Sequence, residues 1–280
     1  MRKIAIASGK GGTGKTTVAV NLAAVASRNT VSVVYLDCDV EEPNGSLFLK
    51  PHIEKTRPVK VSVPGIHEEK CTDCGLCGKI CQYGAIAALN GHILIFPELC
   101  HGCAGCWLVC ETGAVIESKR VVGYLDIGRV EEMTFIQGTL NIGEAMSPPV
   151  IRQVKAAAPE VDLLVIDSPP GTSCPVIESI RDSDYVVLVT EPTPFGLNDL
   201  VLAVEAVRVL GLPFGVVINR CDTGDRQAFD YCRGQGIEIL AEIPDDRSVA
   251  EAYSRGELTC DAIPGYADMF ASLLARLMKA

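Results

Sequence analysis

Residues 9–16 read GKGGTGKT and limit the possible folds of this chain more than any other stretch. They match the pattern G-x-x-x-x-G-K-[ST], with an apolar run over residues 2–8 before them and helical periodicity over residues 15–28 after them. In that setting the glycines let backbone N–H groups converge on one point, where the N-terminus of the following helix favours an anion. The chain is therefore predicted to begin with a strand, a phosphate-binding loop and a helix. An ordinary strand-to-helix turn is the alternative.

The same alternation of strand and helix continues along most of the chain. Short runs rich in Val and Ile, nearly continuous in hydrophobicity, are typical of parallel strands buried on both faces. Such runs cover residues 2–8, 31–37, 161–167, 185–190, 213–219 and 237–243. Segments of helical periodicity cover residues 15–28, 149–158, 174–182, 197–210, 225–235 and 246–255. The fold class is predicted to be α/β, with a doubly wound, mostly parallel sheet.

The alternation stops between about residues 64 and 120, where glycine and cysteine dominate. Here CTDCGLCGKICQYGAI and CHGCAGCWLVCETGAV form an internal repeat, in which Cys71 corresponds to Cys100 and Cys81 to Cys110. A duplicated small unit explains this symmetry. We predict a body made of residues 1–64 and 120–280, with a small α+β domain inserted over residues 65–119. Two strands, over residues 121–128 and 133–140, and a helix that starts at Pro148 and Pro149 should lead back into the body.

The residues of the glycine-rich loop have separate expected roles. The loop residues predicted to bind nucleotide are Gly9, Lys10, Gly11, Gly12, Thr13, Gly14, Lys15, Thr16 and Thr17. Backbone N–H groups from Gly11 to Lys15 would surround the β-phosphate, and Lys15 would neutralise the β- and γ-phosphate oxygens. The Thr16 hydroxyl would bind Mg2+, and Thr17 is placed to reach the α-phosphate.

Acidic residues follow two predicted strands, in DCDVEEPN from Asp37 and in DSPPG from Asp167. Carboxyl ends of parallel strands share one edge of a sheet, which is where an open sheet binds its ligand. Asp167 is the predicted Mg2+ carboxylate of the Walker B type. Asp39 is the candidate to orient the attacking water, and Asp37 is expected nearer the metal. The alternative for each carboxylate is a turn or a helix N-cap.

These motifs together resemble the MinD and Mrp group of deviant Walker A ATPases, which is related to the nitrogenase iron protein. Lys10, the extra lysine in KGGTGKT, carries the resemblance most specifically, supported by DCDVEEPN and DSPPG. In that family the signature lysine reaches the phosphates of the partner in a nucleotide-sandwich dimer. The resemblance thus implies ATP or ADP as ligand, hydrolysis with Lys10, Lys15 and Asp39 as catalytic residues, and an ATP-dependent homodimer, or a heterodimer with a related ATPase. It also implies adenine contacts from Asn219 in VVINR, and from Pro244 and Asp245 in IPDD.

The cysteine runs both have the spacing C-x2-C-x2-C-x3-C, which resembles the bacterial ferredoxins. In those proteins the fourth cysteine of each run ligates the other cluster. The resemblance implies two 4Fe-4S clusters, one held by Cys71, Cys74, Cys77 and Cys110 and the other by Cys100, Cys103, Cys106 and Cys81. The proline that usually follows the fourth cysteine is replaced by Gln82 and Glu111. Structural zinc and disulfides are the alternatives.

The leading hypothesis is a MinD-superfamily ATPase with an inserted ferredoxin-like domain, which couples a nucleotide-driven dimer switch to electron transfer toward a redox or metalloprotein partner. An iron-sulfur cluster carrier is the first alternative, although the late C-x2-C pair of Mrp-type relatives is missing here. A MinD-like positioning ATPase is the second, because residues 266–278 form an amphipathic stripe. That stripe has few cations, so it is expected to dock on the core rather than on a membrane.

Composition and charge limit the kinds of partner and the compartment that we expect for this protein. The net charge of -10 argues against a nucleic-acid partner, which would need a basic face. The first apolar run is too short for a signal peptide, and no stretch approaches the roughly 20 apolar residues of a membrane span. We therefore expect a cytoplasmic protein, where thirteen cysteines favour metal ligation over disulfides.

Overall fold

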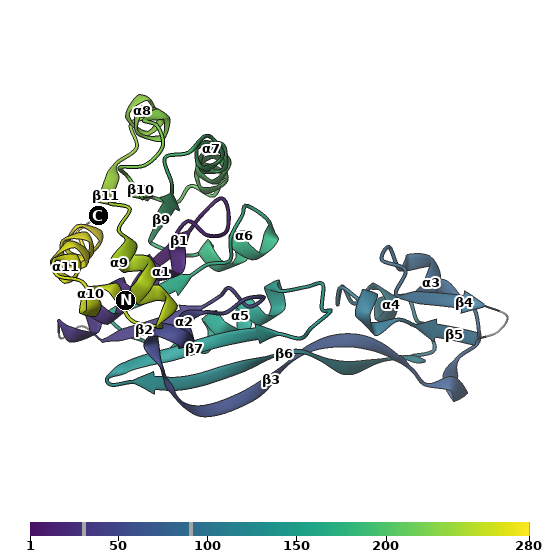
Figure 1. Cartoon of the computed structure of the whole chain (residues 1–280). Coiled ribbons are helices and arrows are strands. Elements are labelled where there is room, and N and C mark those ends of the chain that lie inside the picture. Colours follow the sequence, from purple (N-terminus) through teal and green to yellow (C-terminus); the bar gives the residue numbers. More distant parts are fainter. Residues whose placement is uncertain (30–31, 90–91, 280) are drawn as a thin grey trace.

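The computed structural model describes residues 1–29, 32–89 and 92–279. Val31, the first residue of the strand predicted over residues 31–37, lies outside the described residues, as do residues 30, 90, 91 and 280. A nine-stranded sheet forms the body, and a smaller lobe projects from one of its edges (Figure 1).

The strands are β1 Arg2–Ala7, β2 Val33–Asp37, β3 His52–Ile66, β4 Ile86–Leu89, β5 His92–Ile95, β6 Val115–Val130, β7 Met133–Leu140, β8 Leu163–Asp167, β9 Tyr185–Thr190, β10 Phe214–Asn219 and β11 Ile239–Ile243. The helices are α1 Lys15–Arg28, α2 Gly45–Leu49, α3 Leu76–Ile80, α4 Gly105–Leu108, α5 Pro148–Ala156, α6 Cys174–Ile180, α7 Pro194–Val209, α8 Gln227–Gly234, α9 Arg247–Ser254, α10 Thr259–Ala262 and α11 Tyr266–Leu277. Two short 3-10 turns, η1 Glu68–Lys70 and η2 Pro97–Leu99, lie in the lobe.

The strand order of the main sheet is β11-β10-β9-β1-β8-β2-β7-β6-β3. All strands from β11 to β7 pair in parallel, whereas β6 and β3 pair antiparallel at one edge. This arrangement confirms the predicted mostly parallel α/β sheet. Because the parallel strands share one direction, the residues that follow β1, β2, β8 and β10 meet at the same edge of the sheet.

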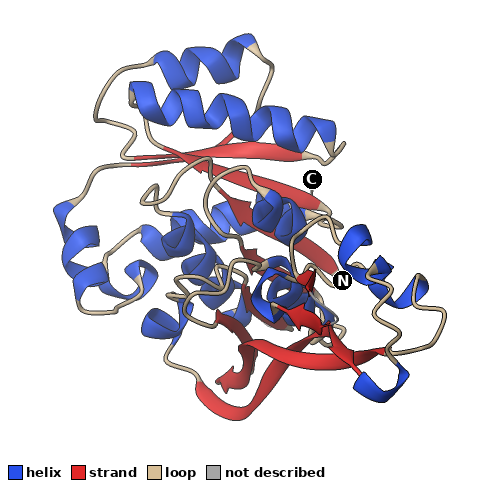
Figure 2. Ribbon diagram, turned by 90° about the vertical axis from the view of Figure 1, so that its right-hand side faces the viewer, coloured by secondary structure: helices blue, strands red, loops and turns tan. Residues whose placement is uncertain are grey.

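Helices cover both faces of the sheet (Figure 2). On one face, α1 and α11 pack on side chains such as Ile4, Tyr35 and Phe135. On the other face, α5, α6, α7 and α8 pack on side chains such as Leu36 and Ile166. Each central strand is therefore buried on both sides, which is why its sequence is nearly continuous in hydrophobicity. The predicted helices and strands of the body are confirmed, with ends that differ by up to three residues, except that the strand predicted over 121–128 begins six residues earlier, at Val115 of β6.

The long pair β3 and β6 was not fully predicted. It runs from the pairing of His52 with Arg129 to that of Ile66 with Val115 and links the body to the lobe. No strand was expected over 52–66, because β3 is an edge strand whose exposed lysines and prolines hide the hydrophobic signal. The predicted domain boundaries at 64/65 and 119/120 consequently fall inside β3 and β6.

The lobe has a two-fold internal repeat in its backbone as well as in its cysteines. Turn η1 and helix α3 in the first half correspond to η2 and α4 in the second. Left-handed backbone recurs at matching positions, Asp73 with Gly102, Gly75 with Ala104, and Gly84 with Gly113. The hairpin β4–β5 corresponds likewise to the lobe ends of β3 and β6, since Ile86 pairs with Ile95 and Ile66 with Val115. Two equivalent cysteine-bearing units thus face each other across the lobe.

Candidate functional site

The glycine-rich loop lies between β1 and α1, where its sequence predicted it. Gly12 and Gly14 have positive φ angles of 79° and 93°, a conformation that glycine adopts without strain. A Cβ on Gly14 would lie 2.4 Å from Nδ2 of Asn219, and one on Gly9 would lie 2.2 Å from the backbone oxygen of Asp199. Glycine is therefore required at both positions by close packing of β10 and α7 against the loop.

A cleft opens above this loop at the carboxyl edge of the sheet. Ten of the predicted nucleotide and magnesium residues line it: Gly11, Gly12, Gly14, Lys15, Thr16, Thr17, Asp39, Asn219, Pro244 and Asp245. Gly9, Lys10, Thr13, Asp37 and Asp167 are not among the residues that line it. Nδ2 of Asn219 donates to the carbonyl of Thr13 at 2.9 Å, so this amide also braces the loop.

Lys15 lies at the centre of an acidic cluster below the cleft. Its Nζ is 2.8 Å from Oδ1 of Asp167 and 3.5 Å from Oδ2 of Asp39. Burial acts to lower the pKa of Lys15, but the charges of Asp167, Asp39 and Asp37 outweigh it and raise that pKa above its usual value. Lys15 is consequently cationic.

The carboxylates of switch segment 37–44, which follows β2, differ in accessibility. Asp37 is fully buried and accepts hydrogen bonds from the backbone N–H groups of Gly45 and Asp39 at 2.9 Å and 3.2 Å. Asp39 instead faces the cleft. Burial raises the pKa of Asp39 to about 6, although Lys15 opposes the shift. Of the two, Asp39 has the accessibility and the pKa of a residue that could accept a proton from water.

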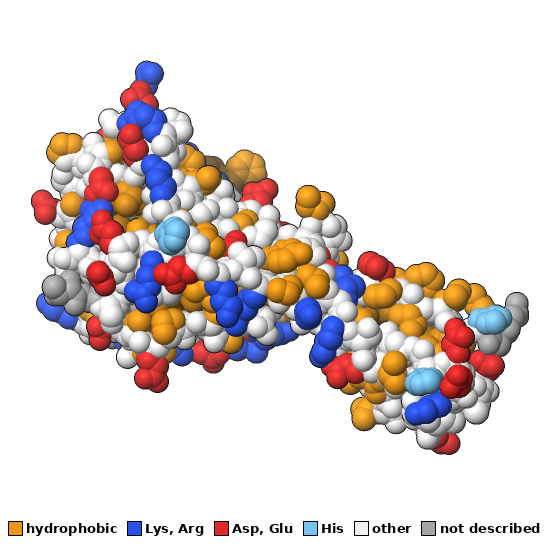
Figure 3. All heavy atoms as spheres, turned by 90° about the horizontal axis from the view of Figure 1, so that it is seen from below, with side chains coloured by type: hydrophobic (Ala, Val, Ile, Leu, Met, Phe, Trp, Pro, Cys, Tyr) orange, Lys and Arg blue, Asp and Glu red, His pale blue; other side chains and the backbone are white. Residues whose placement is uncertain are grey.

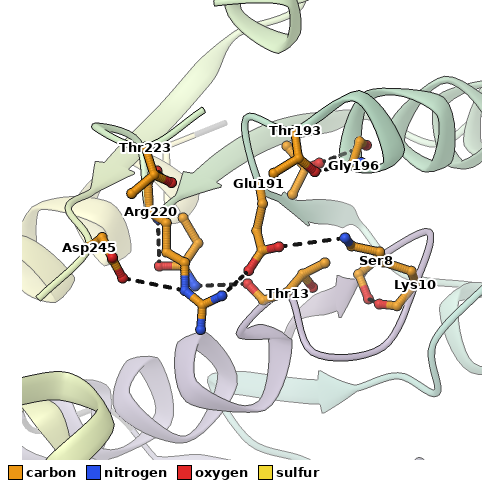
Figure 4. A network of polar contacts seen from close by, with 11 residues as sticks. Ser8, Lys10, Thr13, Glu191, Thr193, Gly196, Arg220, Thr223 and Asp245 are labelled. Carbon is orange, nitrogen blue, oxygen red and sulfur yellow. Dashed lines mark hydrogen bonds and ion pairs between the residues drawn. The ribbon is translucent and has the colours of Figure 1, made fainter. Parts of the chain in front are cut away.

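Lys10 belongs to a charged network beside the cleft (Figure 4). Its Nζ lies 3.5 Å from Oε2 of Glu191, at the end of β9. Arg220, which follows β10, lies 3.0 Å from Oε1 of Glu191 and 3.5 Å from Oδ1 of Asp245. Glu191 thus faces two cations from separate loops. In this arrangement the ammonium group of Lys10 points toward Glu191.

Sequence reasoning did not identify the charged and apolar partners in and around the cleft. Glu191 and Arg220 complete the network, and Tyr253, Tyr266 and Phe270 add an aromatic wall to the cleft. These aromatic residues come from α9 and α11, which the chain reaches only after all strands of the sheet. No motif predicts them. For Tyr266 and Phe270 the apolar stripe of residues 266–278 indicated a buried location, whereas Tyr253 is 46% exposed.

In the lobe the cysteines gather around two small cavities. Cys71, Cys74, Cys77 and Cys110 line one cavity, together with Ile66, Ile93 and Val115. Cys81, Cys100, Cys103 and Cys106 line the other, together with Pro64, Tyr83 and Trp107. Each set takes three cysteines from one half of the repeat and the fourth from the other half.

The spread of the thiols in each set bears on which group could bind there. Among the described residues, no three His, Cys, Asp or Glu side chains converge closely enough to ligate one metal ion. A single zinc ion needs all its thiolates at about 2.3 Å from one point. A 4Fe-4S cluster is bound by four thiolates on separate iron atoms, so the thiols stand around a volume. Four thiols around an apolar cavity fit the cluster better than the ion.

The surroundings of the thiols differ within each set: burial raises the pKa of Cys77 and of Cys106, whereas the pKa of Cys110 is lowered. The backbone N–H of Val115 donates to Sγ of Cys110 at 3.3 Å and, as the largest cause, lowers the pKa of that thiol. The rings of Tyr83 and His101 stack with centroids 3.8 Å apart beside the second cavity. Cys174, Cys221, Cys232 and Cys260 lie in the body, apart from both cavities.

Helix α11 docks on the body as expected. Its apolar side chains Phe270, Leu273, Leu274 and Leu277 are buried in the core cluster that includes α1. Within residues 1–29, 32–89 and 92–279, no helix is long and apolar enough to cross a membrane.

Comparison with known proteins agrees with this geometry. An uncharacterized protein of Methanocaldococcus jannaschii is 34% identical, over 99% of this chain and 96% of that protein. An iron-sulfur cluster carrier protein of Pyrococcus horikoshii is 25% identical, over 91% of this chain and 77% of that protein. The structure of the septum site-determining protein MinD of Pyrococcus horikoshii with Mg-ADP has the same fold, with a TM-score of 0.64 and 21% identity over 99% and 95% of the two chains.

The family model described as the CobQ/CobB/MinD/ParA nucleotide binding domain matches residues 4–259, which include the whole phosphate loop, both acidic segments and the lobe. Because this match spans most of its length, the chain belongs to the CobQ/CobB/MinD/ParA family, with the P-loop of a MinD/ParA-type ATPase.

Proposed function

We propose that this protein hydrolyses ATP as a dimer and uses the nucleotide state to control electron transfer through two 4Fe-4S clusters to a partner protein. One observation carries the proposal. The strands that leave the nucleotide site after α2 and return before β7 also hold a lobe whose eight cysteines surround two cavities in crossed sets. The nucleotide site and the cysteine lobe are thereby joined through the strands β3 and β6.

At the nucleotide site, the residues of the cleft suggest a division of labour. Lys15 and the loop N–H groups bind the β- and γ-phosphates, and the Thr16 hydroxyl binds Mg2+ with Asp167. Asp167 is available for this once Lys15 moves from its Oδ1 to phosphate. Asp39 orients the attacking water. Asn219, Pro244 and Asp245 border the adenine pocket, which the aromatic wall closes.

The proposed dimer gives Lys10 its role. Lys10 cannot serve its own phosphate loop while it pairs with Glu191, and its side chain keeps substantial solvent access. Lys10 is 31% exposed on its side chain and lies 3.5 Å from the largely buried Glu191, so a phosphate across a dimer interface can reach Lys10 and replace Glu191. A homodimer, or a heterodimer with a related ATPase, would place each Lys10 at the partner's nucleotide.

The cysteine sets supply the redox part of the proposal. Bound 4Fe-4S clusters would supply reversible one-electron transfer. The thiols Cys71, Cys74, Cys77 and Cys110 hold the first cluster, and Cys100, Cys103, Cys106 and Cys81 hold the second. Each cavity has one exposed thiol, Cys74 in the first and Cys103 in the second, and solvent exposure is one of the factors that set a reduction potential.

The experiment is a comparison of anaerobically purified protein without nucleotide, with ADP and with a nonhydrolysable ATP analogue. Iron analysis and EPR should show two 4Fe-4S clusters per chain. Their reduction potentials, or the rate of electron transfer to an acceptor protein, should differ between the ADP and ATP-analogue states. Two clusters with identical potentials and transfer rates in all three states would refute the coupling.

A cluster-carrier function is the alternative, and the carrier name of the Pyrococcus horikoshii relative favours it. The arrangement of the remaining thiols does not, because Cys221, Cys232 and Cys260 are not a closely spaced pair. Incubation with a cluster-free acceptor protein separates the two functions. Transfer of iron and sulfide that ATP accelerates would support a carrier, whereas retained clusters would support electron transfer.

A further inference from the structure

The switch segment 37–44 is tied to β7 by a hydrogen bond and by close packing. The carbonyl of Val40 accepts a hydrogen bond from the N–H of Leu140 at 2.8 Å, at the end of β7. Val40 is buried, and a Cβ on Gly138 would lie 2.7 Å from its Cγ1. The segment that contains Asp39 therefore packs on β7 without a gap, and a shift of one displaces the other.

The next link is the loop over residues 141–147, which extends from the body toward the lobe between β7 and α5 (Figure 1). The N–H and Nδ2 of Asn141 donate to the carbonyls of Val122 and Val121 at 2.9 Å and 3.0 Å. Glu144 accepts hydrogen bonds from both Nη atoms of Arg120, and the Nη2–Oε1 distance is 3.2 Å. The Glu144 side chain is 3% exposed and that of Arg120 is 18% exposed, so this ion pair is largely shielded from water.

Arg120 in turn stands beside the second cysteine set. It pairs across the sheet with Val61 of β3, and Val61 and Val63 pack against Cys81 and Cys100. A Cβ on Gly102 would lie 3.4 Å from the Ser62 carbonyl, so the ligand loop touches the same strand. Hydrogen bonds to Glu144 are the largest cause that raises the pKa of Arg120, and the charges of Glu98 and Cys100 add to them. Nε of Arg120 is buried and has no hydrogen-bond partner in the described part of the chain.

We infer that the Arg120–Glu144 pair is the electrostatic link through which the nucleotide site sets the reduction potential of the cluster held by Cys81, Cys100, Cys103 and Cys106. The inference rests on the proposed function and adds the residues that perform the coupling. A shielded cation beside a cluster favours its reduced, more negative state, and its counter-ion opposes that effect. Movement of the 141–147 loop relative to β6 changes how fully Glu144 neutralises Arg120.

The neck of the molecule shows why this pair is well placed. Figure 3 shows the lobe joined to the body by a narrow connection where Lys and Arg side chains gather, while hydrophobic side chains cover much of the lobe. The first cysteine set lies by Ile66 and Val115, farther along the same two strands. Arg120 should therefore act on the second cluster far more than on the first.

Two variants with opposite expected signs test the inference, by EPR-monitored redox titration of the anaerobic holoprotein. Arg120→Gln should lower the potential of the second cluster, and Glu144→Gln should raise it. Each shift is expected to correspond to about a tenfold change in the reduction equilibrium, which is 59 mV for one electron. The first cluster serves as an internal reference and should not move.

Matched controls separate charge from folding. Arg129→Gln removes a similar pair on the same strand, since Arg129 lies 3.5 Å from Glu54 at the exposed far end of β6, and should leave both potentials unchanged. Arg120→Lys keeps the charge and should retain most of the wild-type potential. If Arg120→Gln and Glu144→Gln shift the potential in the same direction, or if Arg129→Gln has an equal effect, the inference is wrong.

Coupling to nucleotide is tested in the same proteins. A difference between the ADP and ATP-analogue potentials that is present in the wild type and lost in Arg120→Gln would support the inference. If this difference in potential persists in Arg120→Gln, the inference is wrong but the proposed function stands. If the wild type shows no such difference, the proposed function itself is wrong. In protein stripped of iron, the ATP analogue should also change hydrogen exchange at the amides of Asn141 and Glu144 at least threefold; no change there contradicts the mechanical link.

Discussion

Charged side chains at the nucleotide site pair with one another. Lys15 forms ion pairs with Asp167 and Asp39, and Lys10 forms an ion pair with Glu191. In the proposed function each cation leaves a carboxylate before it meets a phosphate. This arrangement keeps a cluster of buried charges paired, which lowers the cost of burying them, and leaves the site ready to accept a nucleotide.

The raised pKa of Asp39 predicts a pH dependence. Burial lifts this pKa from the usual 3.8 to about 6, so the carboxylate that we propose orients water becomes protonated as the pH falls below about 6. We expect kcat/KM for ATP to fall nearly tenfold per pH unit below that value, because kcat/KM reports groups of the free enzyme. Measurement of kcat/KM between pH 5 and 8 checks this, and a flat wild-type profile would count against Asp39.

The variant Asp39→Asn should bind ATP yet hydrolyse it at least 100-fold more slowly than the wild type.

The crossed cysteine sets predict which thiols act together. Cys110→Ala should remove the same EPR signal and the same potential as Cys71→Ala, although the two residues are in different halves of the repeat. Cys81→Ala should instead remove the same EPR signal as Cys100→Ala. Iron content should fall by about half in each variant, and Cys174→Ala, an exposed thiol in the body, is the control that should lose none. Loss of one signal by both Cys71→Ala and Cys81→Ala would show uncrossed ligation.

At the scale of elements, the sequence predicted those strands whose surroundings are uniform. β8 and β9 are buried on both faces, so hydrophobicity alone marks them. β3 was not predicted because it is an edge strand. Lys55 and Pro58 prevent it from pairing with a further strand, and residues of these types are also typical of loops. The phosphate loop was predictable because phosphate geometry fixes its residue types. Glu191 and Arg220 were not predictable, because an ion pair between distant residues depends on the tertiary structure and has no characteristic spacing in the sequence.

Helix α11 gives a prediction about stability. Leu277 is 0% exposed and does not line the cleft, so Leu277→Ala should lower the free energy of unfolding by about 2–5 kcal/mol while nucleotide affinity stays within about twofold. Met278, which is 42% exposed, is the control, and Met278→Ala should change stability by less than about 0.5 kcal/mol. Urea unfolding followed by far-UV circular dichroism provides the measurement. Equal stability of Leu277→Ala and wild type would mean that α11 is not part of the core in solution.

At the scale of the whole molecule, the lobe shares β3 and β6 with the main sheet. Its own contents, α3, α4 and the β4–β5 hairpin, form separate hydrophobic clusters around the cysteines. The backbone passes from body to lobe and back through the antiparallel pair that ends at Ile66 and Val115. Body and lobe therefore have separate hydrophobic clusters and are joined by one pair of strands, and the Arg120–Glu144 pair connects that pair of strands to the 141–147 loop of the body.

This organisation predicts that the lobe can be removed. Because Ile66 and Val115 are directly paired, an Asn-Gly turn in place of residues 67–114 should close β3 and β6 as a hairpin. Val61 and Val63, which the lobe covers, should be changed to serine in the same shortened chain to prevent aggregation. This chain should contain no iron, bind ATP within about threefold of the wild type, and dimerise with ATP. The full-length Val61→Ser/Val63→Ser protein is the control for those two changes. A soluble, folded body that no longer binds ATP would show that the lobe helps to build the nucleotide site. The lobe would then have a structural role in addition to its proposed role in electron transfer.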